Sequence, residues 1–365
     1  VDPFQDHVAI RYRIDGTLTE LARVDKSVHE QLIGRLKVLS NLMIYQKRVP
    51  QDGRLKCTIG DREQEFRTSV LPTLHGEKAV LRALHLVGEM LDLDHLGMGG
   101  EMLLEYKNLL SRPQGTIVVT GPAGTGKTTT MYASLKWIAR SKEAPGSIVT
   151  LEDPIERDLG EFTQTQVSPQ AGFTFARGLM TALRQDPDVI MVGEIRDGET
   201  AEIAIEAGLT GHLVITTVHA DRAPGVVTRL IDMGIRPFLV ASSVSAVLSQ
   251  RLVRRLCPHC SVGARPPDYL LDRISYRIQE TDQFRAARGC PKCGDKGYSG
   301  RTGLFELLVL TGPLQEKILE RVPTNLLLKC AVEQGFVSLL DDGLKKARSG
   351  ITSLEEILRV LEERR

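Results

Sequence analysis

The sequence predicts an α/β protein whose largest part is a mostly parallel sheet covered by helices on both faces. Two observations lead to this prediction. Short β-branched segments alternate with amphipathic helical segments between residues 103 and 256, as in parallel strands joined by helices. Polar residues directly follow each strand-like segment, at the edge where open α/β sheets bind ligands. We expect a small α+β domain before this core, and a cysteine-containing module and short helices after it.

The individual elements follow from hydrophobic periodicity and from β-branched runs. Strands are predicted over residues 116–120, 147–151, 189–192 and 213–217, and helices over 128–139, 175–183, 200–207 and 223–233. In the first domain we expect a strand over 8–14 and helices over 27–42 and 77–91. Turn and linker residues divide the chain into a first domain at 1–95, a linker at 96–102, a core at 103–256, a cysteine module at 257–303 and a helical region at 304–365.

Composition restricts the class of partner. The chain carries 47 Lys and Arg against 46 Asp and Glu, a formal net charge of +1 at pH 7. A nucleic-acid-binding surface usually appears as a basic domain or stripe, so we expect no nucleic-acid partner. The apolar runs fall short of the ~18 residues that a membrane helix needs, and we expect no leader peptide. The sequence therefore predicts a soluble protein that meets a membrane only peripherally.

Residues 121–128 are the most specific motif in the chain. They read Gly-Pro-Ala-Gly-Thr-Gly-Lys-Thr and match G-x-x-x-x-G-K-[ST], a loop that wraps the phosphates of a nucleotide. A strand precedes the loop and a helix follows it, so backbone N–H groups and the helix dipole favour an anion there. Lys127 would reach the β- and γ-phosphates, and the Thr128 hydroxyl would ligate Mg²⁺. The motif predicts that the chain binds ATP or GTP through Gly121, Pro122, Ala123, Gly124, Thr125, Gly126, Lys127, Thr128 and Thr129.

Carboxylates follow the second and third predicted strands. Residues 152–156, Glu-Asp-Pro-Ile-Glu, stand where carboxylates beside a phosphate loop polarise water or hold Mg²⁺ through its water shell. A usual Walker B strand ends in Asp, whereas here Gly193 stands at that place and Glu194 follows it. Glu194 can still reach the magnesium shell. A solvated acidic turn and a helix-capping carboxylate are the alternative interpretations of these two segments.

Two histidines flank the fourth predicted strand. His219 follows the strand, at a position from which an imidazole can donate to a γ-phosphate and respond to its loss. His212 precedes the same strand. Either histidine taken alone is explained as well by a structural role.

Four of the six cysteines form two C-x-x-C pairs, Cys257 with Cys260 and Cys290 with Cys293. Two such pairs place four thiolates around a tetrahedral Zn²⁺, and a set of four protein ligands indicates a structural metal. Residues 261–289 separate the pairs and include a predicted helix over 269–285. Free thiols in a reducing compartment and redox-active pairs are the alternatives.

Four arginines stand out in the first domain: Arg48, Arg54, Arg67 and Arg82. A guanidinium binds phosphate with two parallel hydrogen bonds and keeps its charge. With a nucleotide site in the next domain, some of them could sense the γ-phosphate. Each one alone is better explained as a solvated surface residue.

Taken in order, these motifs resemble the secretion ATPase superfamily, in particular the type II secretion system ATPases (general secretory pathway protein E) and the type IV pilus assembly ATPases. The resemblance covers essentially the whole chain and implies a RecA-like P-loop NTPase core preceded by a PAS-like domain. Residues 48–54 and 71–82 resemble the second N-terminal domain of the family, 121–128 its Walker A, 151–156 its Asp box, 183–197 its unusual Walker B, 210–219 its His box, and the four cysteines its zinc motif.

The resemblance implies a cytoplasmic ATPase that works as a homo-hexamer at the inner membrane with ATP, Mg²⁺ and structural Zn²⁺. Glu156 would orient the attacking water, Glu194 would hold Mg²⁺ with Thr128, His219 would sense the phosphate, and Arg67 and Arg82 would bring the first domain onto the γ-phosphate. The implied partners are an inner-membrane platform protein and a cytoplasmic adaptor domain, through which the chain associates peripherally with the membrane. The leading adaptor-docking segment of the family is missing from the sequence, so we expect weak assembly and slow hydrolysis.

The favoured function is a motor that drives pseudopilus or pilus assembly and protein export by type II secretion, with type IV pilus assembly as the alternative. A pilus retraction ATPase is disfavoured because retraction motors lack the four-cysteine module. A DNA-translocating ATPase would use a basic pore, for which Arg251, Arg254 and Arg255 are the candidates. A non-catalytic, nucleotide-gated scaffold would have no need of Glu156.

Overall fold

The computed structural model describes residues 1–14, 16–84, 92–141, 146–274, 277–279 and 282–362. The chain divides into two compact units, Val1–Gly88 and Glu89–Arg365. The predicted linker at 96–102 lies within the second unit. Leu93 and Met98 are buried in the core of that unit, and Leu96 O accepts a hydrogen bond from Gly303 N at 3.1 Å. These contacts explain why a glycine-rich stretch is part of the folded second unit.

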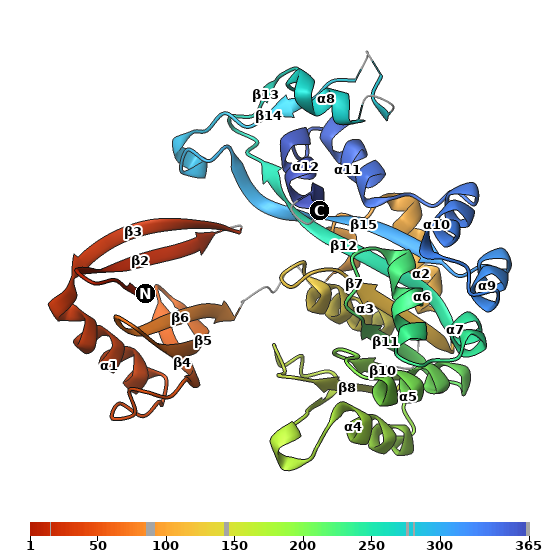
Figure 1. Ribbon diagram of the computed structural model, residues 1–365, viewed down its shortest axis with the longest axis horizontal. Helices are drawn as coiled ribbons and strands as arrows, with labels where there is room; N and C mark the ends of the chain where they lie inside the picture. The colour runs from red at the N-terminus through yellow and green to blue at the C-terminus, as the bar shows by residue number, and fades with distance from the viewer. Residues whose placement is uncertain (15, 85–91, 142–145, 275–276, 280–281, 363–365) are drawn as a thin grey trace. The chain divides into compact units, whose positions relative to one another are not determined.

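In its described residues the first unit combines two three-stranded antiparallel sheets with helix α1 (Figure 1). Its elements are β1 (Asp2–Pro3), β2 (His7–Ile14), β3 (Thr17–Asp25), α1 (His29–Leu39), β4 (Gln51–Ile59), β5 (Arg62–Thr73) and β6 (Gly76–Leu84). Ile33 of α1 packs against Val70 and Ala79 of the β4–β5–β6 sheet. A buried ion pair also joins the helix to this sheet, because Lys37 Nζ lies 2.7 Å from Glu77 Oε1.

The helix predicted over residues 77–91 is wrong where the structure describes it. Residues 77–84 belong to strand β6, and residues 85–91 lie outside the described residues. Ala79 is buried whereas Val80 and Arg82 are exposed, so burial alternates with the period of a strand. The apolar residues of this segment fit either period, and pairing with β5 decides between them.

The second unit is built on a seven-stranded sheet in the order β15-β12-β7-β11-β10-β8-β9. Its strands are β7 (Gly115–Thr120), β8 (Ile148–Glu152), β9 (Thr163–Gln166), β10 (Val189–Val192), β11 (Leu213–Thr217), β12 (Val244–Leu256) and β15 (Tyr298–Val309). All neighbouring pairs are parallel except β12 with β15. The predicted mostly parallel α/β class is therefore confirmed.

Helices cover both faces of this sheet (Figure 1). Ile117 and Val119 of β7 face a core shared with α2 (Gly100–Leu110) and α3 (Lys127–Ser141). Val118 points to the opposite core, which includes α4 (Phe175–Ala182), α5 (Gly198–Leu209), α6 (Ala223–Asp232) and α7 (Pro237–Ser243). This burial on both faces explains the continuous apolar runs of the central strands.

The remaining elements follow β12. They are β13 (Val262–Gly263), α8 (Asp268–Ile274), β14 (Arg285–Ala286), α9 (Gly312–Leu319), α10 (Thr324–Glu333), α11 (Leu339–Arg348) and α12 (Leu354–Glu362). The helix predicted over 269–285 is shorter than expected, because α8 ends at Ile274. Strand β15 crosses the predicted boundary between the cysteine module and the C-terminal region. No described helix is both long enough and apolar enough to pass through a bilayer.

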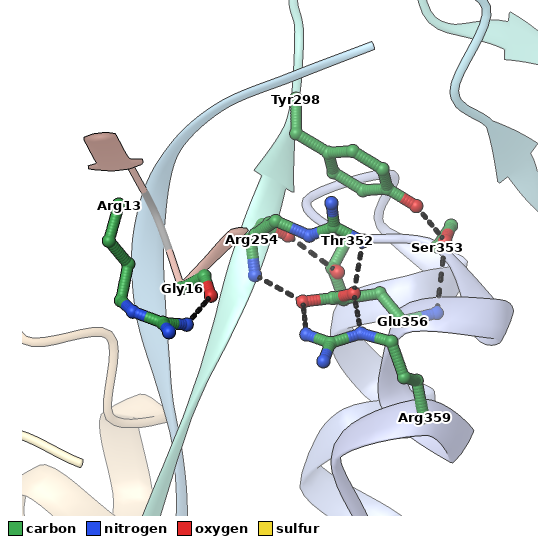
Figure 2. A network of polar contacts seen from close by, with 8 residues as sticks. All are labelled: Arg13, Gly16, Arg254, Tyr298, Thr352, Ser353, Glu356 and Arg359. Atoms are coloured by element: carbon green, nitrogen blue, oxygen red, sulfur yellow. Dashed lines mark hydrogen bonds and ion pairs between the residues drawn. The ribbon is translucent and has the colours of Figure 1, made fainter. Parts of the chain in front are cut away.

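A buried carboxylate fastens α12 to strand β12 (Figure 2). Glu356 Oε2 accepts a hydrogen bond from Arg254 Nη2 at 2.7 Å and another from Arg359 Nε at 2.7 Å. The Arg254 guanidinium also lies over the ring of Tyr298, 4.1 Å from its centroid. Burial would raise the pKa of Glu356, but the hydrogen bonds from Arg359 and Arg254 outweigh it and hold the pKa below its ordinary value.

We expect Glu356→Gln to lower the free energy of unfolding of the second unit by about 3 kcal/mol near pH 7, because Arg254 loses its buried partner. The Glu356 pKa is lowered in the folded state, so its contribution is complete above the ordinary value of 4.5 and is lost as the pH falls through the folded-state pKa. Denaturation at a series of pH values measures both effects. Glu355→Gln on the same helix is the control, and equal losses in the two variants would contradict the assignment.

Candidate active site

The pairing of the parallel strands brings four strand ends to one edge of the sheet. Val192 of β10 is opposite Leu151 of β8 and Thr216 of β11, and Thr217 is opposite Val119 of β7. The segments that leave these strands carry the phosphate loop, the acidic segment 152–156, Glu194 and His219. The sheet therefore gathers the residues that the sequence predicted for nucleotide chemistry.

The phosphate loop joins β7 to the first turn of α3. Gly121 has φ +141°, and a Cβ at this position would lie 2.5 Å from Gln250 O, so the tight approach to β12 requires glycine. Lys127 Nζ donates to the carbonyl oxygens of Gly121 and Pro122 at 2.8 and 3.0 Å. Thr128 and Thr129 are half-buried at the start of the helix. The loop thus has the strand–turn–helix context that phosphate binding needs.

Gln250 of β12 holds this loop against the sheet. Its side chain is buried, its Nε2 donates to Thr125 O at 2.7 Å, and its Oε1 accepts from Thr130 Oγ1 at 2.8 Å. One amide therefore fixes both the loop and the first turns of α3. No local signal in the sequence marks Gln250, because the strand that carries it was not predicted.

Glu194, just after the end of β10, contacts the side chains of Arg196 and His219. Its Oε1 accepts a short hydrogen bond from Arg196 Nη2, and its Oε2 lies 3.5 Å from His219 Nε2. Arg196 Nη1 also lies 3.6 Å from Asp153 Oδ2. Arg196 was missed as a site residue, although it stands only two positions after Glu194 in the segment that the sequence singled out.

Gly193 allows this segment to turn beside β8. Its N donates to Leu151 O at 2.8 Å, and a Cβ would lie only 3.2 Å from the same oxygen. A side chain at the usual Walker B aspartate position would therefore be in tight contact with the neighbouring strand. The carboxylate of this segment comes from Glu194, one position later.

The ammonium of Lys127 lies in the electrostatic field of this cluster. Burial lowers the pKa of Lys127 from its ordinary value, and the positive charge of Arg251 lowers it further. The carboxylates of Glu194 and Glu156 act in the opposite direction. Glu156 is exposed on the loop after β8. The charges of Glu194 and Glu156 therefore act on the Lys127 ammonium.

The other predicted residues are placed as follows. His212 lies before β11, away from the phosphate-loop edge, and its Nδ1 is 3.2 Å from Ala207 O, which is a structural contact. Arg67 of β5 pairs in register with Arg54 of β4 and Arg82 of β6. All three arginines are exposed in the first unit, and so is Arg48. Residues directly opposite each other share a face of an antiparallel sheet, so Arg54, Arg67 and Arg82 form a row of like charge.

The four paired cysteines form one cluster, with all sulfur atoms within 4.8 Å of one another. Sγ–Sγ distances are 4.0 Å for Cys257 and Cys290, 3.8 Å for Cys260 and Cys293, and 3.7 Å for Cys290 and Cys293. Zn–S bonds of about 2.3 Å place tetrahedral thiolates about 3.8 Å apart, so this donor set fits Zn²⁺.

Backbone hydrogen bonds favour a thiolate within this cluster. Burial would raise the pKa of Cys293, but N–H groups of Cys290 and Gly297 donate to its sulfur at 3.3 and 3.2 Å and lower the pKa to about 7. Thiolates are the form that ligates zinc.

Comparison with known proteins assigns the chain to a family. The family described as "Type II/IV secretion system protein" matches residues 1–359. The chain belongs to this family. The resemblance that the motifs suggested is therefore confirmed.

Two relatives within the family and one solved structure are similar to the chain. It is 47% identical over 363 residues to the type II secretion system ATPase E of Vibrio cholerae serotype O1, covering 100% of this chain and 71% of that protein. It is 42% identical over 360 residues to the type IV pilus assembly ATPase PilB of Thermus thermophilus, covering 98% and 40%. The X-ray structure of the Legionella pneumophila ATPase DotB shares its fold, with a TM-score of 0.69, 20% identity, and coverage of 97% of this chain and 90% of that one.

We expect the purified, reduced protein of this secretion-system family to contain about one zinc per chain, and the Cys257→Ser, Cys260→Ser double variant to lose it. Loss of the ion should also lower the thermal unfolding temperature, because two thiolate ligands no longer hold the two knuckles together. Elemental analysis and thermal denaturation measure the two effects. Cys330→Ser is the control for a cysteine outside the cluster; wild-type protein without zinc would rule out the metal assignment.

Proposed function

We propose that this chain is the cytoplasmic ATPase of a type II secretion system, a homo-hexameric motor that hydrolyses ATP to drive pseudopilus assembly and protein export. The proposal rests on the surroundings of Glu194 at one sheet edge. Glu194 contacts Arg196 and His219, and its charge acts on the ammonium of Lys127. The 47% identity to a type II secretion system ATPase supports the same conclusion.

The phosphate loop would bind ATP through its backbone N–H groups, with Lys127 on the β- and γ-phosphates. Mg²⁺ held by Thr128 and Glu194 would neutralise charge on these phosphates, and hydroxyl and carboxylate oxygens are ligands that suit this ion. Glu156 is the proposed base that orients the attacking water. His219 and Arg196 both contact the carboxylate of Glu194, and His219 is the proposed sensor of the γ-phosphate.

The arginine row of the first unit is the proposed second half of the site. Arg67 and Arg82 are exposed, adjacent and of like charge, so a polyanion that binds both relieves their repulsion. Binding of the γ-phosphate would draw the first unit to the second, and loss of the phosphate would release it. This cycle is the proposed source of movement for the motor.

Assembly and partners complete the proposal. We place the hexamer at the cytoplasmic side of the inner membrane, attached through an adaptor domain and acting on a platform protein. A type IV pilus assembly ATPase is the alternative, which the 42% identity to PilB supports.

A DNA-translocating motor is disfavoured by the positions of its candidate arginines. Arg254 is paired with Glu356, and Arg251 Nη2 donates to Asp221 O at 2.7 Å. Both side chains therefore hold the second unit together. Arg255 alone of the three is exposed.

We expect Lys127→Ala and Glu194→Ala each to lower the rate of ATP hydrolysis by at least about 100-fold, because each removes charge stabilisation at the phosphates. Phosphate release by the intact protein measures the rate. Lys136→Ala, on the same helix α3 but outside the loop, should retain wild-type activity. Full activity in either site variant would refute the assigned site, and full activity in Glu156→Ala would refute the role of Glu156 as the base.

We expect Arg67→Gln and Arg82→Gln to lower the hydrolysis rate at least about tenfold while the first unit stays folded. The reason is the loss of positive charge at the transferred phosphate. Steady-state rates and circular dichroism test the prediction. Arg35→Gln, on the exposed side of α1, is the matched control, and an equal rate loss in this variant would count against a specific role for the row.

A further inference from the structure

We propose that Tyr132, Glu152 and Gln164 are positioning residues that fix the loop carrying Glu156 to the helix that follows the phosphate loop. The inference rests on the proposed function, because a chain that hydrolyses ATP needs its base held at a set distance from the bound phosphates. The sequence assigned no role to Tyr132 or Gln164, and it included Glu152 only as one carboxylate of the acidic segment 152–156.

Glu152 is the centre of this network. It is the last residue of β8, its side chain is buried, and only 3% of the residue is exposed. Its Oε1 accepts from Thr150 Oγ1 at 2.6 Å and from Gln164 Nε2 at 3.0 Å, and its Oε2 accepts a short hydrogen bond from Tyr132 OH. Among the described residues no Lys or Arg pairs with it. A carboxylate whose oxygens are occupied by neutral donors acts as a fixed anchor, whereas Glu156, four positions later, is exposed.

Gln164 ties the loop after Glu156 to this anchor. Its Nε2 also donates to Arg157 O at 3.0 Å, and its Oε1 accepts from Leu159 N at 2.7 Å. Both ends of one amide are thus used on the backbone that immediately follows Glu156. The loop is held by β9 on one side and by the end of β8 on the other.

Tyr132 connects the same loop to the phosphate-binding helix. It lies on α3, which begins at Lys127. Its hydroxyl donates to Glu152, and the backbone N–H of Arg157 acts to lower the pKa of the same hydroxyl. Burial, followed by the hydrogen bond to Glu152, raises the pKa of Tyr132, so the phenol stays protonated and remains a donor. A rigid helix therefore relates the position of Lys127 to the position of Glu156.

The test compares two buried tyrosines that each bond through the hydroxyl. Tyr132→Phe removes the link to the Glu156 loop. Tyr106→Phe removes a hydrogen bond of 2.9 Å to Ser134 on the same helix α3, with no connection to that loop. We expect Tyr132→Phe to lower kcat by about 10- to 100-fold, with the Kd for ATP within about twofold of wild type. Tyr106→Phe should leave kcat unchanged, although both variants lose one buried hydrogen bond.

A double-variant cycle separates positioning from general destabilisation. If Tyr132 acts through Glu156, adding Tyr132→Phe to Glu156→Ala should lower the single-turnover rate no further. The inference would be overturned if the loss in the double variant equalled the product of the losses in the two single variants. An unchanged kcat in Tyr132→Phe would also overturn it. If Tyr132→Phe does not fold, Gln164→Met in the edge strand β9 replaces it in the same comparison with Glu156→Ala. Wild-type protein without ATPase activity would instead refute the proposed function, so the two failures are distinguishable.

Discussion

The parallel pairing of β7, β8, β10 and β11 is the constraint on which the site depends. Parallel strands in this register end at one edge, and the segments that leave them there carry the phosphate loop, the carboxylates of residues 152–156, Glu194 and His219. Residues as distant in sequence as Lys127 and His219 thereby interact with Glu194. The helices on both faces maintain the register, because a slip of one residue would turn buried Val118 and Ile117 to the wrong faces.

Buried carboxylates fasten the helices of the second unit to its sheet. Glu306 of β15 accepts from Ala223 N at the start of α6 and from Leu339 N at the start of α11, at 2.8 and 3.2 Å. Burial raises the pKa of Glu306, while these two N–H donors stabilise its charge. Glu356 is held differently, by the guanidinium of Arg254. In both cases removal of one partner leaves a buried polar group unsatisfied, so these contacts specify the packing of the helices.

The sequence predicted the central elements well because their signals are local. The predicted helix over 175–183 corresponds to α4 at Phe175–Ala182, and the strand over 189–192 agrees with β10. Strands β12 and β15 were missed, since their antiparallel partnership joins segments about 50 residues apart and leaves no local pattern. Gln250 was missed because it lies on β12. Motifs identified the charged site residues, whereas the neutral residues that hold them, such as Tyr132, have no sequence signature.

One continuous strand connects the two chemical centres of the second unit. Strand β12 pairs with β7, presents Gln250 to the phosphate loop, binds Glu356 through Arg254 and is followed directly by Cys257. Seven residues of extended chain from Gln250 to Cys257 span about 23 Å. Strand β15 pairs with β12 as far as Leu256, so hydrogen bonds to a second strand hold this segment extended (Figure 1). A mechanical load applied at the cysteine cluster would therefore be transmitted along β12 to Gln250, the side chain that holds the phosphate loop.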